Sequence, residues 1–259
     1  MDSMRNLGLE GWHRLDKYDR ATGKHLETCF KKNTITTAGR QLFLDIIIGT
    51  STNRLTQANA HLYLFAGAGG SPVKTIAGAT SAPDHGTNRQ VSWQWQDNTV
   101  DTYAANRLEV RAGASPIFSD STPNFGTKPT SQNWHYTYSV TISGPPSFND
   151  GVGGYGGLHS MLRMLTGATT MPNDENVTFI RIRTDTGTVI GELKATSVSR
   201  SGQTAEWVWV VPAGSATGNW YNIEFYSLAD DGHTIRRSDD GLGNKSAATE
   251  RTYRYRLSV

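Results

Sequence analysis

The sequence holds little of what several large protein classes require. Cys29 is its one cysteine, so no intramolecular disulfide can form and assembly in a reducing cytosol is expected. The longest aliphatic run, residues 46–48, is far too short to span a bilayer. Residues 1–5 carry an early acid and no apolar core, so no secretory signal is expected there. We therefore expect a soluble protein without membrane contact.

The two signs of charge are nearly balanced. Lysine and arginine number 25 against 23 aspartate and glutamate residues, a net charge of +2. Such a balance gives no broad attraction to nucleic acid or to an anionic membrane, so neither is expected as a partner. Glycine reaches 27 residues against only 9 prolines, which is typical of a folded chain with many tight turns.

Metal-binding patterns are missing as well. No two of the seven histidines stand two or four residues apart, and zinc-ligand spacing is absent. Residues 239–244 offer enough oxygens for a loose Ca²⁺ site, but they lack the spaced acids and the closing glutamate of an EF-hand loop. A solvated turn is the preferred interpretation, and no required metal is expected.

Catalytic and nucleotide-binding motifs have simpler interpretations. Residues 151–156, Gly-Val-Gly-Gly-Tyr-Gly, match the dinucleotide pattern in form. That motif needs a strand that leads directly into the loop, and Gly-Pro-Pro at residues 144–146 intervenes. Asp84 and His85, and the acids and histidine of residues 230–233, lie in turn-rich segments where Asp and Gly serve the turn. We expect no catalytic residues, no cofactor and no enzymatic activity.

What the chain does contain is the same pattern twice. An apolar helical segment that ends in Gly49 has a counterpart that ends in Gly167, 118 residues later. Three strand-like segments recur in the same order, at offsets of 114, 115 and 117 residues. They are 91–96 with 206–210, 107–110 with 222–225, and 136–140 with 253–257. Four matches in order predict a duplicated β-rich unit of about 115 residues, and such duplications favour binding and assembly over new chemistry.

The alternation of side chains supports this duplication. In residues 252–259 the aromatic and aliphatic side chains share one face, and Arg254 and Arg256 share the other, as in a strand with one face on a core. Residues 136–142 repeat the alternation in phase. A one-residue slip would exchange buried and exposed faces, so the preserved phase is stronger evidence than the residue identities.

Only two segments have helical periodicity. The first is expected to begin at Thr36 or Thr37 and to end at Gly49, and the second to end at Gly167. Their apolar side chains lie at 42, 43, 46 and 47, and at 158, 161, 162 and 165. Further strands are expected at about 12–18, 61–66, 104–111, 177–183, 188–196 and 219–227, with turns at 19–24 and 185–187.

These elements predict a mainly β protein. We expect two tandem, internally duplicated β-sandwich or jelly-roll-like units, each with one short packed helix. The units are expected at residues 1–142 and 158–259, joined by a Gly/Pro-rich linker at 143–157. Residues 1–11 carry few apolar side chains and are expected to form an arm that orders on docking.

One strand is open to more than one assignment. Trp134 and His135 resemble Trp12 and His13, which open the first copy. The strand at residues 134–142 therefore closes the first copy, opens the second or is shared between them.

The tryptophans divide into two groups. The pairs at 93 and 95 and at 207 and 209 each put both rings on one strand face. Because this arrangement recurs, burial in each core is preferred over a stacking platform for sugars or bases. Trp134, Trp220 and Tyr221 are the candidates for exposed contact with a partner, together with Arg254 and Arg256 on the polar face of the last strand.

A local pattern then indicates a family. Residues 31–39, Lys-Lys-Asn-Thr-Ile-Thr-Thr-Ala-Gly, lead into the first helix, and the strand at 62–65 ends in Gly-Ala-Gly. Residues 108–113, Leu-Glu-Val-Arg-Ala-Gly, form a later strand. Over residues 10–142 the chain resembles small bacteriophage virion proteins of the head-decoration and tail-appendage kind. These often show an Asn-x-Ile-Thr-x-x-Gly entry to a helix, a Gly-x-Gly strand exit and a Thr-Glu-Val-Gly-Leu-like strand, in which Arg111 replaces the usual glycine.

The resemblance implies a non-enzymatic virion structural protein, made in the host cytoplasm and carried in multiple copies or as a homo-oligomer. Its implied partners are other virion proteins, capsid or tail subunits. We expect a capsid decoration or cement subunit; the alternatives are a tail-associated fibre, collar or adaptor protein, and a glycan-binding receptor module. A carbohydrate-active enzyme would need a paired Asp/Glu site, and none can be placed.

Overall fold

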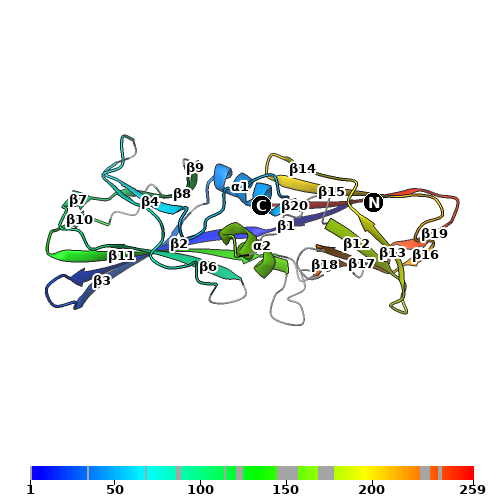
Figure 1. Ribbon diagram of the computed structural model, residues 1–259, viewed down its shortest axis with the longest axis horizontal. Helices are drawn as coiled ribbons and strands as arrows, with labels where there is room; N and C mark the ends of the chain where they lie inside the picture. Colours follow the sequence, from blue (N-terminus) through cyan, green and yellow to red (C-terminus); the bar gives the residue numbers. More distant parts are fainter. Residues whose placement is uncertain are drawn as a thin grey trace.

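Figure 1 shows the computed structural model, an elongated assembly of β-sheets with two short helices near its middle. The structure describes residues 2–33, 35–67, 69–85, 89–113, 115–120, 125–144, 157–168, 178–227, 234–238 and 241–259. In these ranges the chain forms strands β1 to β20 and helices α1 and α2. The expectation of a mainly β protein is confirmed.

The first half of the chain forms two four-stranded sheets. Its strands are β2 (Gly8–Asp19), β3 (His25–Asn33), β4 (Ala60–Phe65), β5 (Lys74–Ile76), β6 (Gln90–Asp97), β7 (Tyr103–Ala104), β8 (Arg107–Ala112), β9 (Ser115–Asp120), β10 (Thr127–Lys128) and β11 (Gln132–Ser143). Sheet I has the order β3-β2-β11-β6, sheet II has the order β5-β4-β8-β9, and β7 pairs with β10. All neighbours in these sheets are antiparallel.

The second half also forms two four-stranded sheets. Its strands are β12 (Thr178–Arg183), β13 (Val189–Lys194), β14 (Ser197–Ser201), β15 (Thr204–Val211), β16 (Gly218–Trp220), β17 (Asn222–Ser227), β18 (Thr234–Ser238), β19 (Gly243–Lys245) and β20 (Arg251–Ser258). Sheet III has the order β1-β20-β15-β14, where β1 is Asp2–Asn6; sheet IV has the order β13-β12-β17-β18, and β16 pairs with β19.

The tryptophans of β6 join sheets I and II. Trp93 and Trp95 are fully buried, and their indole nitrogens donate to the carbonyls of Leu55 and Ala60, at 2.7 and 2.8 Å. Trp93 also contacts Phe118 of sheet II. The two sheets therefore face each other across an aromatic core. Large rings such as tryptophan favour burial of this kind because their single N–H donor is satisfied at one edge.

The second half repeats this arrangement. Trp207 and Trp209 of β15 are fully buried, and both lie edge-on to Phe225 of β17, in sheet IV. Tyr255 of β20 contacts the same ring. Burial of both tryptophan pairs, expected from the sequence, is confirmed.

Both helices form where their periodicity predicts. Helix α1 spans Thr37–Ile47, and the N-cap Thr36 accepts a hydrogen bond from the Gly39 N–H at 2.9 Å. Helix α2 spans Gly157–Thr166. Each is followed by a glycine with positive φ, Gly49 at 82° and Gly167 at 74°, a conformation that favours glycine at a helix end.

The helices lie at the junction of the two halves (Figure 1). They contact each other, and each also reaches the opposite half: α1 contacts β15, and α2 contacts β6 and β11. The Leu55 N–H donates to the Leu165 carbonyl at 2.8 Å, and Arg200 pairs with Asp45. The halves are thus joined by packed elements as well as by the chain.

The N-terminal residues are not the free arm expected from the sequence. Strand β1 pairs in parallel with β20, so that residues 2–6 belong to a sheet of the second half. Leu7 and Leu9 are buried, and the Leu7 N–H donates to the Ser258 carbonyl at 2.7 Å. The apolar side chains of this segment are few, but two of them reach the core and the backbone completes a sheet.

The strand with several possible assignments belongs to sheet I. Strand β11 pairs along its length with β2 on one side and with β6 on the other. Most of the expected linker, residues 145–156, lies outside the described residues, as do the Gly-rich match at 151–156 and residues 230–233 and 239–240.

Other local expectations hold with small changes. The segments 104–111 and 219–227 each contain two strands, β7 with β8 and β16 with β17. Both expected turns form, with Gly23 and Gly187 at φ of 68° and 83°. Neither helix in the described residues is long and apolar enough to cross a membrane.

Candidate functional site

Two of the five expected contact residues are core residues. Trp134 and Trp220 have an exposed fraction of 0%, so the expectation that they are exposed is wrong. Trp134 lies edge-on to Tyr103 and donates to the Gln132 side chain at 2.8 Å. Trp220 donates to the Ala216 carbonyl at 2.7 Å. Each ring packs inward because its own half satisfies the indole N–H.

The other three lie at the surface. Tyr221 is 45% exposed, as expected. Arg254 and Arg256 are half-buried on the face of β20 opposite its core residues, in the predicted phase, and Arg256 pairs with Glu206 at 2.5 Å. Their contact with a partner stays a prediction. Tyr221 lies between β16 and β17, whereas both arginines lie on β20.

The sequence reasoning missed a polar cluster on sheet I. Asp16 lies on the face of β2 opposite the buried Leu15. Its carboxylate accepts from Arg14 Nε at 2.7 Å and from Thr28 Oγ1 at 2.5 Å, and His25 Nε2 lies 3.5 Å away. Burial alone would raise the pKa of Asp16, but the hydrogen bonds from Arg14 and Thr28 hold it below its usual value.

Aromatic rings extend this cluster. Tyr18 lies between two imidazoles, with ring centroids 5.3 Å from His25 and 4.7 Å from His135. Burial lowers the pKa of His135, which favours its neutral form. The members come from β2, β3 and β11 and are adjacent only through the strand register. The one signal in the sequence was the alternation that places His135 on the polar face.

The cluster does not form a proton relay. Nε2 of His25 lies 2.9 Å from Thr28 Oγ1 and 3.5 Å from Asp16. In a nucleophile–base–acid chain, the acid holds the ring nitrogen that faces away from the nucleophile. Here one nitrogen meets both groups, so the contacts join β2 to β3 and do not activate Thr28.

A second polar cluster is enclosed at the end of β6. The Asp97 carboxylate accepts from Tyr103 Oη and Thr99 Oγ1, each at 2.6 Å. Lys128 Nζ lies 4.0 Å from Asp97 and donates to the Thr99 carbonyl at 2.7 Å, and Tyr136 Oη lies 3.2 Å from Tyr103 Oη. The side chains of Asp97 and Lys128 have no exposed surface, so no substrate reaches them.

The electrostatics of the enclosed cluster follow from burial and pairing. Burial alone would raise the pKa of Asp97, but the hydrogen bonds from Thr99 and Tyr103 hold it below its usual value. Burial, together with the hydrogen bond to Asp97, raises the pKa of Tyr103. Burial lowers the pKa of Lys128. The cluster fixes the loop after β6, since the carboxylate and the ammonium compensate each other where neither meets water.

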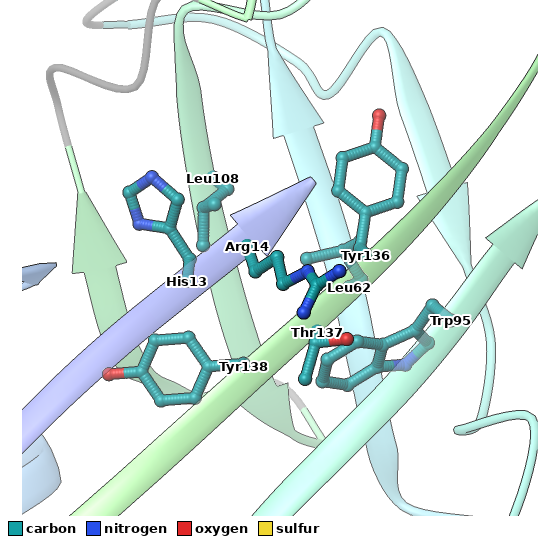
Figure 2. Close-up of a pocket in the computed structure, with 8 residues that line it drawn as sticks. All are labelled: His13, Arg14, Leu62, Trp95, Leu108, Tyr136, Thr137 and Tyr138. Carbon is teal, nitrogen blue, oxygen red and sulfur yellow. The ribbon is translucent and has the colours of Figure 1, made fainter. Parts of the chain in front are cut away.

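Two cavities lined by described residues are small. Figure 2 shows one between sheets I and II, with a volume of about 10 Å³, room for roughly one water molecule. The eight residues that line it are His13, Arg14, Leu62, Trp95, Leu108, Tyr136, Thr137 and Tyr138. A second cavity of about 10 Å³ lies beside α1. Neither is large enough for an organic substrate.

The remaining sequence candidates have structural roles. The Asp84 backbone forms a bridge with Ser92 at the edge of sheet I, and His85 Nε2 lies 3.1 Å from Thr166 Oγ1, at the end of α2. No three His, Cys, Asp or Glu side chains in the ranges given above are placed to hold a metal ion.

Comparison with known proteins adds no relative. No protein-family model matches the sequence, and neither a curated protein nor a solved structure matches it.

Proposed function

We propose that this chain is a non-enzymatic structural protein built from two copies of one β-sandwich unit. The observation that carries the proposal is the order of the strands. Sheet II has the order β5-β4-β8-β9 and sheet IV has the order β13-β12-β17-β18, so that β4, β5, β8 and β9 hold the same places as β12, β13, β17 and β18. The two-stranded pair β7/β10 corresponds in the same way to the pair β16/β19. In both halves a helix precedes these strands. Such agreement of order and connection supports a duplication.

Equivalent contacts support the same relation. The Thr80 N–H donates to the Gln94 carbonyl, and the Thr196 N–H donates to the Val208 carbonyl, each at 2.7 Å. Lys128 of β10 is fully buried and donates to loop carbonyls that follow β6. Lys245 of β19, also fully buried, donates to the carbonyls of Pro212 and Ser215, which follow β15. A buried lysine is costly to keep, so its recurrence is strong support.

The helices support an approximate twofold relation between the halves. Helix α1 packs on β9 and reaches β15, while α2 packs on β18 and reaches β6. In the proposed correspondence, β9 matches β18 and β6 matches β15. Each helix therefore makes the same pair of contacts, one within its own half and one across the junction.

The proposed role is that of a bacteriophage virion subunit, most specifically a capsid decoration or cement protein. Two features favour it: the resemblance of residues 10–142 to virion proteins, and a duplicated unit that presents two similar, unequal surfaces on one chain. Linking two weak contacts raises avidity without new chemistry, which suits a subunit that bridges neighbouring shell proteins.

The test is binding to particles. Mass spectrometry of purified virions of the encoding phage should detect the chain. Purified protein, added to particles that lack it, should bind capsids and saturate at a fixed ratio. Binding to isolated tails alone would move the assignment to a tail-associated protein. Absence from virions, with no binding to either structure, would overturn the virion role but would leave the duplicated fold untouched.

A glycan-binding role is the second candidate, and one observation favours it. Phe30 is 60% exposed and stacks on Trp12, with ring centroids 5.2 Å apart and planes 8° apart, and exposed aromatic faces suit sugars. A glycan array with the wild-type protein and Phe30→Ala tests it, with Val100→Ala as a matched exposed control. Binding that Phe30→Ala alone removes would favour this role.

A further inference from the structure

Strand β3 is the longest edge strand in the part of the chain that the structure describes. It spans nine residues, His25–Asn33, at one end of sheet I. The other edge of that sheet, β6, is covered in part, since Asp84 bridges Ser92 and the Thr80 N–H donates to the Gln94 carbonyl. In the described residues, the edge strands of the other three four-stranded sheets have six residues or fewer. A long edge presents unpaired backbone groups and favours pairing with another strand.

Strand β3 is also exposed on both faces. Residues 25–32 are exposed, with only Cys29 half-buried. Phe30 and Leu26 remain 60% and 46% exposed. A strand that buries neither face within its own chain adds little packing energy as it grows longer. The length of β3 is therefore better explained by a second strand that pairs with its free edge.

The second half manages without such a strand. Its sheet III ends on β1, which pairs with β20 over five positions. In sheet I the strand that corresponds to β20 is β11. Strand β11 pairs with the twelve residues of β2, and β3 lies on the far side of β2. Strand β2 holds the place beside β11 that β1 holds beside β20, so β3 is the strand of sheet I without a counterpart in sheet III.

We propose that β3 pairs antiparallel with β3 of a second copy of this chain, centred on Cys29, to join two copies of sheet I into one continuous sheet. A twofold axis through the sheet places residue 27 of each copy opposite residue 31 of the other. Glu27 then faces Lys31 of the second copy twice, a complementary pair at each end of the contact. Registers centred on residue 28 or residue 30 place residue 27 opposite residue 29 or residue 33 of the second copy, so they lose this charge match.

The same register gives the exposed aromatic a partner. Phe30 stands opposite Thr28 of the second copy and diagonal to its Phe30, a separation of roughly 7–8 Å that large side chains span. The stacked Trp12–Phe30 pair then continues across the contact as a row of four rings. The interface removes from water the ring of Phe30, which is 60% exposed in the monomer.

Two features of β3 limit where this pairing extends. The β2–β3 register shifts at Lys17/Tyr18, opposite residues 25–27, and such a bulge bends the strand away. Lys31 and Lys32 place positive charge on the edge, a common protection against unspecific pairing. The proposed contact covers residues 27–31, beyond the bulge, and places Lys31 opposite Glu27 of the second copy. The contact is therefore specific for a strand with an acidic residue at that position.

Cys29 reports directly on this geometry. In the proposed register the two Cys29 Cα atoms lie about 4.5–5.5 Å apart, within the range of about 4.4–6.8 Å that a disulfide needs. Mild oxidation of the purified protein with copper phenanthroline, followed by non-reducing electrophoresis, should give a covalent dimer. Burial and Glu27 raise the pKa of the Cys29 thiol, so the reaction is run at mildly alkaline pH.

Charge exchange provides the matched control. In a Cys29→Ser background, sedimentation velocity should show a reversible dimer, and Glu27→Lys or Lys31→Glu alone should weaken it by roughly tenfold. The double variant Glu27→Lys/Lys31→Glu restores the opposite charges and should recover the dimer. Because Glu27 also pairs with Lys17, thermal unfolding of each variant confirms that the monomer remains folded.

Three results would overturn the proposal. They are a monomer at every concentration with no Cys29 cross-link, a dimer that neither single charge variant weakens, and a dimer that the double variant fails to recover while remaining folded. None of these measurements uses virions, so the proposal stands or falls independently of the virion role.

Discussion

At the scale of single residues, the core depends on polar atoms that are satisfied inside it. Trp93, Trp95 and Trp220 each donate an indole N–H to a backbone carbonyl. The buried lysines, Lys128 and Lys245, do the same with their ammonium groups. An unsatisfied buried donor costs about 1–3 kcal/mol, so these contacts specify which loops lie over which ring.

The matched tryptophans should respond alike to truncation. Trp93→Ala and Trp207→Ala each remove a fully buried ring, at positions that correspond in the proposed duplication, and each should lower the free energy of unfolding by about 3–5 kcal/mol. Urea denaturation measures the change. A variant that unfolds like the parent would contradict the core assignment of that ring.

The enclosed carboxylate should make stability depend on acid. The folded-state pKa of Asp97 lies below its unfolded value. The contribution of Asp97 to the free energy of unfolding is therefore fully present above the pKa of the unfolded state, near 3.8. It is lost as the pH falls below that value through the pKa of the folded state. Asp97→Asn should lower the melting temperature at pH 7 and flatten its dependence on acid pH. Asp101→Asn, with an exposed carboxylate, is the control and should change neither by much.

At the scale of elements, local signals were sufficient wherever the period of the sequence decides the structure. The capping threonine before α1, the glycines after both helices and the alternation in β11 and β20 were predictable because each depends on residues a few positions apart. Trp134 and Trp220 were misplaced because burial depends on what the rest of the fold lays over a ring. The Asp16 cluster was missed because only strand register brings its members together.

The contribution of the N-cap of α1 to stability can be tested by removing Thr36 Oγ1. Thr36 Oγ1 accepts from the Gly39 N–H and donates to the Ile117 carbonyl, both at 2.9 Å. Thr36→Ala should cost about 0.5–2 kcal/mol of stability, measured by chemical denaturation. Thr36→Ser keeps the hydroxyl and should cost much less; equal losses would show that the methyl group, and not the hydrogen bonds, matters.

Strand β1 should stabilise the second half although it begins the first. A chain that starts at Leu7 loses the β1–β20 ladder, at about 0.5–1.5 kcal/mol for each backbone hydrogen bond. Hydrogen exchange should then speed up along β20 and β15 and remain slower in sheet I. A chain that lacks only Met1 is the control. Uniform acceleration in both halves would contradict a local role for β1.

At the scale of the whole molecule, the two halves should unfold together. Each helix also contacts a sheet of the other half, and Arg200 pairs with Asp45 across the junction. Scanning calorimetry should show one transition whose calorimetric and van't Hoff enthalpies agree. Arg200→Ala removes one contact across the junction and should lower the transition without splitting it. Two separate transitions in the wild type would mean that the halves are independent domains.

The pairing of β1 with β20 also sets an order of events during synthesis. Asp2 is synthesised long before its partner in the register, Arg254. Sheet I can close as soon as β11 emerges, whereas β1 must remain without its partner strand until β20 has been made. Contacts so distant in sequence form late and slowly. During that interval β1 is exposed to chaperones and to neighbouring nascent chains, so residues 2–6 pair only after every other strand of the described residues has been made.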